Sequence, residues 1–100
     1  MPPREPRTYY TYIMGSVTGV FYVGITGNLE ARVEQHKSGR TRGFTSWYRV
    51  TRLLYFEEFS SPTEAIHREK EIKGWRRQKK FDLIATRNPR LDDLSEEWVR

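Results

Sequence analysis

Glu69 is the residue whose position most strongly suggests chemistry. On a helix its face is shared with Ala65, Ile66 and Ile72, apolar residues that are expected to meet the core. A carboxylate on such a face must be paired with a cation, protonated or bound to a metal ion. Two interpretations stay open from the residues alone: a metal ligand, or a glutamate at the edge of the core that pairs with a nearby arginine.

Arg32 and His36 form a second candidate group, because a spacing of four residues places both side chains on one face of a helix. The planar guanidinium of an arginine suits phosphate, to which it donates two charge-assisted hydrogen bonds. A histidine beside it can position water or transfer a proton. The alternative interpretation is an ordinary exposed helix face.

Tyr12 and Tyr22 lie in two segments that we expect to pair as a hairpin. If the turn between them is centred on Val17, the two tyrosines lie directly opposite each other on one face of the sheet. Tyrosines in strands most often serve packing. Two facing phenols near an arginine and a glutamate can instead hold a water molecule or a phosphate oxygen, and a nearby cation can lower a phenol pKa.

The elements that must position these side chains follow from local signals. Asn28 is a good helix N-cap, Gly39 suits the position after a helix, and Ser61-Pro62-Thr63-Glu64 is a capping box with proline in the first turn. We expect an α+β fold, with a small, mainly antiparallel, three-stranded sheet flanked by helices. The expected strands are residues 8–14, 20–25 and 50–59, and the expected helices are residues 28–38, 61–73 and 75–86.

The length and composition of the chain indicate one small domain. One hundred residues without a cysteine exclude disulfides, thiolate zinc sites and a cysteine nucleophile. We expect a loose N-terminal arm at residues 1–7, a domain at residues 8–94 and an acidic C-terminal tail at residues 95–100. The N-terminus shows no secretory signal or membrane span, so the expected location is the cytoplasm.

Positive charge is clustered along the chain, whose net charge is +5. Residues 68–80 carry seven basic residues against two acidic ones, and residues 37–52 carry five basic residues and no acidic one. Such clusters favour a polyanion as partner, although a solvated helix face is the alternative. We expect the following residues to contact nucleic acid: Arg40, Arg42, Trp47, Lys70, Lys73, Arg76 and Arg77.

The candidate residues resemble, as an ordered set, the GIY-YIG nuclease superfamily. Tyr10-Thr11-Tyr12, ten residues before Tyr22-Val23-Gly24, is similar to the paired strand motifs of that superfamily. Arg32 matches its helix arginine, His36 a histidine found one turn later in many members, and Glu69 its metal-binding glutamate.

The resemblance covers about residues 8–94 and looks closest to the small stand-alone branch, similar to the catalytic domain of the bacterial excision-repair incision subunit. It implies a metal-dependent endonuclease that hydrolyses DNA phosphodiester bonds. Glu69 would hold one Mg²⁺ or Mn²⁺, and Arg32 would brace the scissile phosphate. Tyr12 and Tyr22 would orient or deprotonate the attacking water, and which of them acts as the base stays open. His36 completes the expected catalytic set.

Three departures from the family pattern keep alternatives open. Tyr10 stands where the first motif usually has glycine, Ile25 stands where many members have lysine, and Asn88 is only a candidate for the late asparagine. The alternatives are a nucleic-acid-binding module that scarcely cleaves, and a protein–protein adaptor that uses the acidic tail and Trp98. Branched, damaged or single-stranded DNA are the expected substrates. We expect specificity to come from the domain itself or from a protein partner, or to be low.

Overall fold

The computed structural model describes residues 7–39, 43 and 47–98, which form one three-stranded antiparallel sheet with helices on both faces. The strand order is β2-β1-β3, so β1 is the central strand and pairs with both neighbours. The predicted α+β class is therefore confirmed. The elements are β1 (Tyr9–Gly15), β2 (Phe21–Thr26), α1 (Leu29–Lys37), β3 (Arg52–Phe59), α3 (Pro62–Lys73), α4 (Arg77–Ala85) and the short 3-10 helix η1 (Leu94–Trp98).

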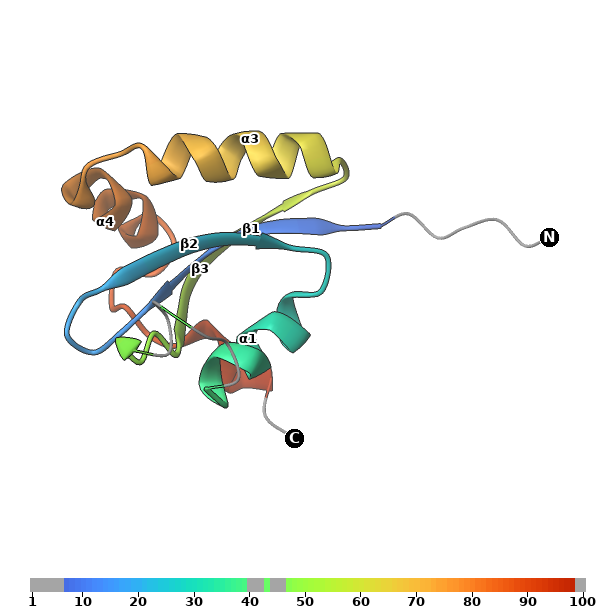
Figure 1. The fold of residues 1–100 in the computed structure, drawn as a ribbon. Coiled ribbons are helices and arrows are strands. Elements are labelled where there is room, and N and C mark those ends of the chain that lie inside the picture. Colours follow the sequence, from blue (N-terminus) through green and yellow to red (C-terminus); the bar gives the residue numbers. More distant parts are fainter. Residues whose placement is uncertain (1–6, 40–42, 44–46, 99–100) are drawn as a thin grey trace.

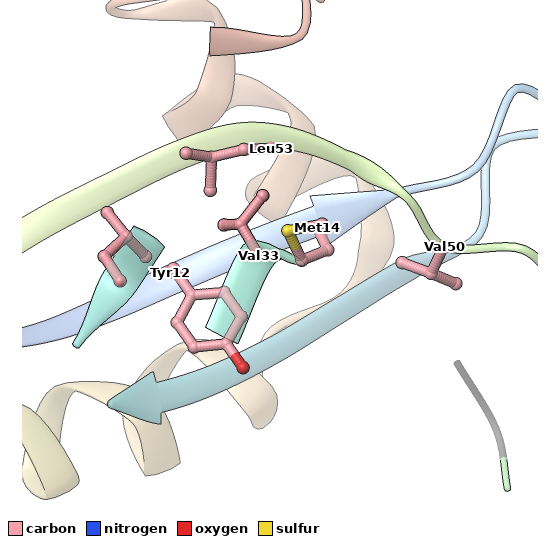
Figure 2. Close-up of a cluster of buried hydrophobic side chains, with 6 residues drawn as sticks. Tyr12, Met14, Val33, Val50 and Leu53 are labelled. Carbon is pink, nitrogen blue, oxygen red and sulfur yellow. The ribbon is translucent and has the colours of Figure 1, made fainter. Parts of the chain in front are cut away.

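The sheet separates two small hydrophobic cores. Figure 1 shows α1 and the C-terminal segment beneath the sheet, and α3 and α4 above it. Tyr12, Met14 and Leu53 belong to the core beneath the sheet, together with two apolar residues of α1. Ile13 points to the other side, as strand alternation requires, and packs with Ile72 and other residues above the sheet. Figure 2 shows the lower core, in which the Tyr12 ring packs among aliphatic side chains while its hydroxyl oxygen points away from them.

The hairpin register differs from the one predicted. Tyr12 pairs with Gly24, and Tyr22 pairs with Met14, so the two tyrosines are diagonal neighbours and not directly opposite. The difference arises in the turn, which is centred on Thr18 because the backbone N–H of Ser16 donates to the carbonyl of Val20 at 3.0 Å. A shift by one residue in the centre of the turn moves the partner by two residues, which keeps both rings on one face of the sheet.

The helix starts follow the predicted caps. Asn28 caps α1 by accepting from the backbone N–H of Ala31 at 3.1 Å, and Ser61 caps α3. Two expectations are wrong in detail: the last long helix begins at Arg77, two residues later than predicted, and Ile66 is 38% exposed and does not face the core.

A buried carboxylate fastens the C-terminal segment to β3. Asp93 accepts hydrogen bonds from the backbone N–H groups of Leu53 and Ser95, at 3.1 and 3.0 Å, and pairs with the ammonium group of Lys37. Burial raises the pKa of Asp93, but the Lys37 ammonium and these donors outweigh it and hold that pKa below its usual value. The short helix η1, which this carboxylate fastens to β3, was not predicted.

Asn88 holds the segment after α4 against β3. Its side-chain amide donates to the carbonyls of Leu54 and Asp92, at 3.0 and 2.8 Å, and its oxygen accepts from the Asp92 N–H. Asn88 therefore joins the end of α4 to β3. The described part of the chain contains no helix with the length and apolar character needed to cross a membrane.

Candidate active site

Tyr12 is the centre of the candidate site, and two side chains of α1 meet its hydroxyl group. Arg32 Nε donates to Tyr12 Oη at 3.1 Å, and His36 Nε2 lies 3.2 Å from the same oxygen. The strand alternation that buries Met14 beneath the sheet also directs Tyr12 there, toward α1. Tyr12 is 0% exposed, so its ring serves as part of the core while its oxygen serves as a hydrogen-bonding hub.

His36 is buried, and its hydrogen bonds define its tautomer. The ring is 2% exposed, and Nδ1 has no hydrogen-bond partner among the described residues. A proton on Nδ1 would be a buried donor without an acceptor, which costs more than an unpaired lone pair. The favoured tautomer therefore carries its proton on Nε2 and donates it to Tyr12 Oη. Burial, with a smaller contribution from the Arg32 guanidinium, lowers the pKa of His36 to about 4, so the ring is neutral near pH 7.

Two donors on Tyr12 Oη leave the tyrosine proton free to point elsewhere. Burial nevertheless raises the pKa of Tyr12 to about 12, although the hydrogen bond and charge of Arg32 act in the opposite direction. Tyr12 is thus a protonated group at neutral pH. Its chemical role in the structure is to fix the positions of Arg32 and His36.

Arg32 is held in one plane by two different acceptors. Besides donating to Tyr12, its Nη1 donates to Gln35 Oε1 at 2.9 Å. The hydrogen bond to Tyr12, with a smaller contribution from Tyr22, raises the pKa of Arg32. A guanidinium whose plane is fixed in advance loses less entropy when it binds a phosphate.

Tyr22 lies beside this group and is more accessible than Tyr12. Its ring centroid is 6.2 Å from that of Tyr12 and 5.3 Å from that of His36, and its side chain is partly exposed. Gly24 makes this arrangement possible, because a Cβ atom there would lie 2.7 Å from Tyr12 Oη and 3.0 Å from Tyr22 Cε2. This role of Gly24 was not predicted from the sequence. The glycine of the second strand motif could have indicated it, but only with the correct strand register, in which Gly24 pairs with Tyr12.

Glu69 lies in α3, on the opposite face of the sheet from α1 (Figure 1). It occupies the sheet-facing stripe with the buried residues Ala65 and Ile72, and its side chain is 17% exposed. Among the described residues its ion-pair partner is Lys73, at 3.0 Å, and not an arginine as one interpretation expected. No described contact joins Glu69 to the four residues beneath the sheet. Its negative charge nonetheless contributes to the raised pKa of Tyr12, which lies in the central strand.

The donors for a metal ion are therefore few. Among residues 7–39, 43 and 47–98, no three histidine, aspartate or glutamate side chains gather as a metal site would require. Glu69 offers a single carboxylate, a hard oxygen donor. That suits a hydrated Mg²⁺ or Mn²⁺, which takes most of its ligands from water and phosphate, and does not suit a cage of protein ligands.

The residues predicted to contact nucleic acid divide into three groups. Arg40 and Arg42 lie outside the described residues. Lys70, Arg76 and Trp47 are exposed, and Trp47 is 84% exposed, so it does not pack the loop against the core.

The third group already has a contact within the chain. Lys73 pairs with Glu69, and the Arg77 guanidinium lies over the Phe21 ring with 4.5 Å between its central carbon and the ring centroid. Arg77 therefore links α4 to the hairpin, while both side chains keep exposed surface.

Known proteins are similar to this chain over most of its length. The GIY-YIG catalytic domain family matches residues 8–82. A UPF0213 protein of Staphylococcus haemolyticus is 40% identical over 79 residues, which cover 79% of this chain and 96% of that protein. A UPF0213 protein of Staphylococcus aureus is 38% identical over 80 residues, covering 80% of this chain and 98% of that protein.

A solved structure is similar as well. The solution NMR structure of a UPF0213 protein of Bacillus halodurans covers 89% of this chain and 95% of its own, with 29% sequence identity and a TM-score of 0.57. The matched family spans both strand motifs, Arg32, His36 and Glu69. The chain belongs to the GIY-YIG catalytic domain family, which is a family of nucleases.

Proposed function

We propose that the chain is a divalent-metal-dependent endonuclease that hydrolyses phosphodiester bonds in DNA. The observation that carries this proposal is the hydrogen-bonded group of Tyr12, Arg32 and His36, which orients a guanidinium beside a partly exposed tyrosine, Tyr22. Packing alone does not require a cation, yet the Arg32 guanidinium is held in one plane at the edge of the core. Catalysis of phosphoryl transfer depends on such prior orientation.

The two tyrosines differ in burial, and we therefore assign them different roles. Tyr12 is 0% exposed, and burial raises its pKa to about 12, so it neither reaches an attacking water nor accepts its proton near pH 7. We assign it as a positioning residue. Tyr22 is partly exposed and stands next to Arg32, so it is the tyrosine that orients the water. To act as the general base it must first release its own hydroxyl proton to solvent, and the resulting phenolate then accepts the proton of the attacking water.

Arg32 binds the scissile phosphate and balances the negative charge that grows on it during the reaction. His36, neutral and donating to Tyr12, keeps the phenol oxygen in place and adds no second positive charge beside the guanidinium. Glu69 is the residue that would hold Mg²⁺ or Mn²⁺. Because it lies in α3, on the other face of the sheet from Arg32, the phosphate would have to meet both side chains around the free edge of β2. Such an ion supplies Lewis-acid polarisation of the phosphate and stabilises the leaving oxygen. Lys73 must release Glu69 first, which its flexible and half-exposed side chain allows.

The basic side chains at the end of α3 and in α4 would follow the phosphate backbone, and Trp47 would stack on an unpaired base. Branched, damaged and single-stranded DNA are the substrates we propose to test first. We also propose that a protein partner supplies targeting and that the protein acts in the cytoplasm.

The test is cleavage of labelled duplex, single-stranded and branched DNA in Mg²⁺ or Mn²⁺, with a chelator as control. Tyr22→Phe removes only the hydroxyl group, and Tyr9→Phe is the matched control, because Tyr9 lies at the start of β1 outside the site. We expect Tyr22→Phe to lower the cleavage rate by roughly 10²-fold or more with DNA affinity unchanged, since general base catalysis contributes on this order. Equal rates for the two variants would contradict the role of Tyr22. Salt-sensitive DNA binding without cleavage of any substrate by the wild type would favour the binding module.

A further inference from the structure

A hollow of about 350 Å³ lies at the end of the sheet where β1 begins, and none of the described site side chains lines it. Its volume falls in the lower part of the range of small-molecule sites. Three aromatic residues from three different elements line it: Tyr10 of β1, Phe56 of β3 and Trp98 of η1. The first turn of α1 closes one side (Figure 1 shows α1 next to the C-terminal segment).

Tyr10 is the residue that stands where the first strand motif of the family usually has glycine. Its ring meets Phe56 edge-on, with 6.1 Å between the ring centroids and 68° between the ring planes. Trp98 reaches the hollow because η1 is fastened to β3 by the hydrogen bonds of Asp93. The aromatic wall is thus built by side chains that the candidate active site does not use.

The charge of the hollow is opposite to that of the whole chain. Among the described residues that line it, Glu30 and Glu58 are acidic and none is basic, although the chain has 18 lysine and arginine residues and a net charge of +5. Glu58 pairs with Tyr10 across the two strands, so one carboxylate stands directly beside the aromatic wall. Carboxylates here repel a phosphate backbone and attract a cation.

We propose that this hollow binds a guanidinium group, presented by an arginine side chain of a partner protein. A guanidinium stacks on aromatic rings through cation–π contacts while its N–H groups donate in pairs to a carboxylate. Tyr10, Phe56 and Trp98 offer the rings, and Glu58 offers the carboxylate. The partner would thus approach from the end of the sheet and leave the basic surface of α3 and α4 to nucleic acid.

The test is an NMR titration of the full chain with N-acetylarginine methylamide. The matched ligand is the citrulline analogue, which has nearly the same shape and no charge, and deoxyguanosine monophosphate represents a nucleic-acid ligand. We expect saturable shifts of the Trp98 indole N–H with the arginine compound, and an affinity roughly tenfold or more above that of citrulline. Equal affinity for arginine and citrulline, tighter binding of the nucleotide, or the absence of saturable shifts would each overturn the proposal.

Two variants test whether the arginine compound binds in this hollow. Glu58→Gln keeps the size of an exposed side chain and removes its charge, and Glu64→Gln is the matched control, an exposed glutamate in the first turn of α3. We expect Glu58→Gln to weaken arginine binding about tenfold and Glu64→Gln to leave it unchanged. Trp98→Leu, which removes one aromatic wall, should weaken it as well. Unchanged arginine binding in both Glu58→Gln and Trp98→Leu would show that the hollow is not the site.

Discussion

Replacing Gly24 with alanine tests the geometry of the candidate active site most sensitively. The new Cβ atom would lie 2.7 Å from Tyr12 Oη and 2.8 Å from Tyr12 Cζ, whereas ordinary contacts begin at 3.4 Å. The phenol must therefore move by about 0.7 Å, in a core where its ring is 0% exposed. Its hydrogen bonds to Arg32 and His36, now 3.1 and 3.2 Å long, cannot both survive a shift of that size.

The expected loss of unfolding free energy is roughly 2 to 4 kcal/mol, from about 1–3 kcal/mol for overpacking and about 1 kcal/mol for the loss of one of the two hydrogen bonds. The assay is urea unfolding followed by circular dichroism, in which the midpoint falls while the slope stays constant. Gly74→Ala is the matched control. Gly74 has φ −77°, and a Cβ there meets only backbone oxygens at 3.5 and 3.6 Å, so we expect stability to be unchanged or slightly higher. Equal stability of the Gly24→Ala protein and the wild type would refute the close approach of Tyr12 to this backbone.

Three further predictions concern buried polar groups. Burial lowers the pKa of His36 from 6.5 to about 4. Between these two pH values the unfolded chain binds the proton and the folded chain does not. The free energy of unfolding should therefore fall as the pH drops through this window, by up to roughly 3 kcal/mol. Denaturation across pH should show this slope in His67→Gln, which changes an exposed histidine, and should lose it in His36→Gln. Tyr12→Phe removes the acceptor shared by the arginine and histidine of α1, so it should cost about 1–3 kcal/mol in urea unfolding, and a fully stable variant would argue against the hub. Asp93→Asn replaces the buried carboxylate that fastens η1 to β3 and should cost about 2–4 kcal/mol, while the exposed Asp92→Asn should change the melting temperature little.

Much of the fold was predictable because local signals coincide with the tertiary structure. The caps at Asn28 and Ser61 fixed the starts of α1 and α3, and the β-branched and aromatic runs fixed the three strands. The hairpin register was not predictable in the same way. The turn depends on which backbone groups pair around Ser16, and a shift of one residue in its centre leaves the same residues on each face.

The candidate site was predictable as a set of residues but not as an arrangement. Spacing alone placed Arg32 and His36 on one face of α1, as the structure shows. It did not reveal that the hydroxyl group of a fully buried Tyr12 binds both, since that depends on the packing of α1 against the sheet. The lack of room for a Cβ atom at Gly24 could not be predicted from the sequence either, because it depends on which residue of β1 pairs with Gly24.

Glu69 shows the limit of helix periodicity. The stripe it shares with Ala65 and Ile72 was predicted correctly, but Ile66 turns to solvent, because α3 meets the sheet along a narrower face than the sequence pattern suggests. The pairing of Glu69 with Lys73 follows from their spacing of four residues, which favours an ion pair on a helix. One interpretation of the sequence expected an arginine partner instead.

The measurement that tests the nuclease proposal most directly is nicking of supercoiled plasmid in Mg²⁺ or Mn²⁺ by the wild type, Glu69→Gln and Glu64→Gln proteins, each with a chelator control. Glu64 is an exposed glutamate in the first turn of the same helix, so its variant controls for the loss of one negative charge. We predict that the wild type and Glu64→Gln proteins nick the plasmid only with metal. The Glu69→Gln protein should not nick it, yet should bind DNA with the same salt dependence. Metal-dependent nicking by Glu69→Gln at the wild-type rate would contradict the assignment of Glu69 as the metal ligand of this site.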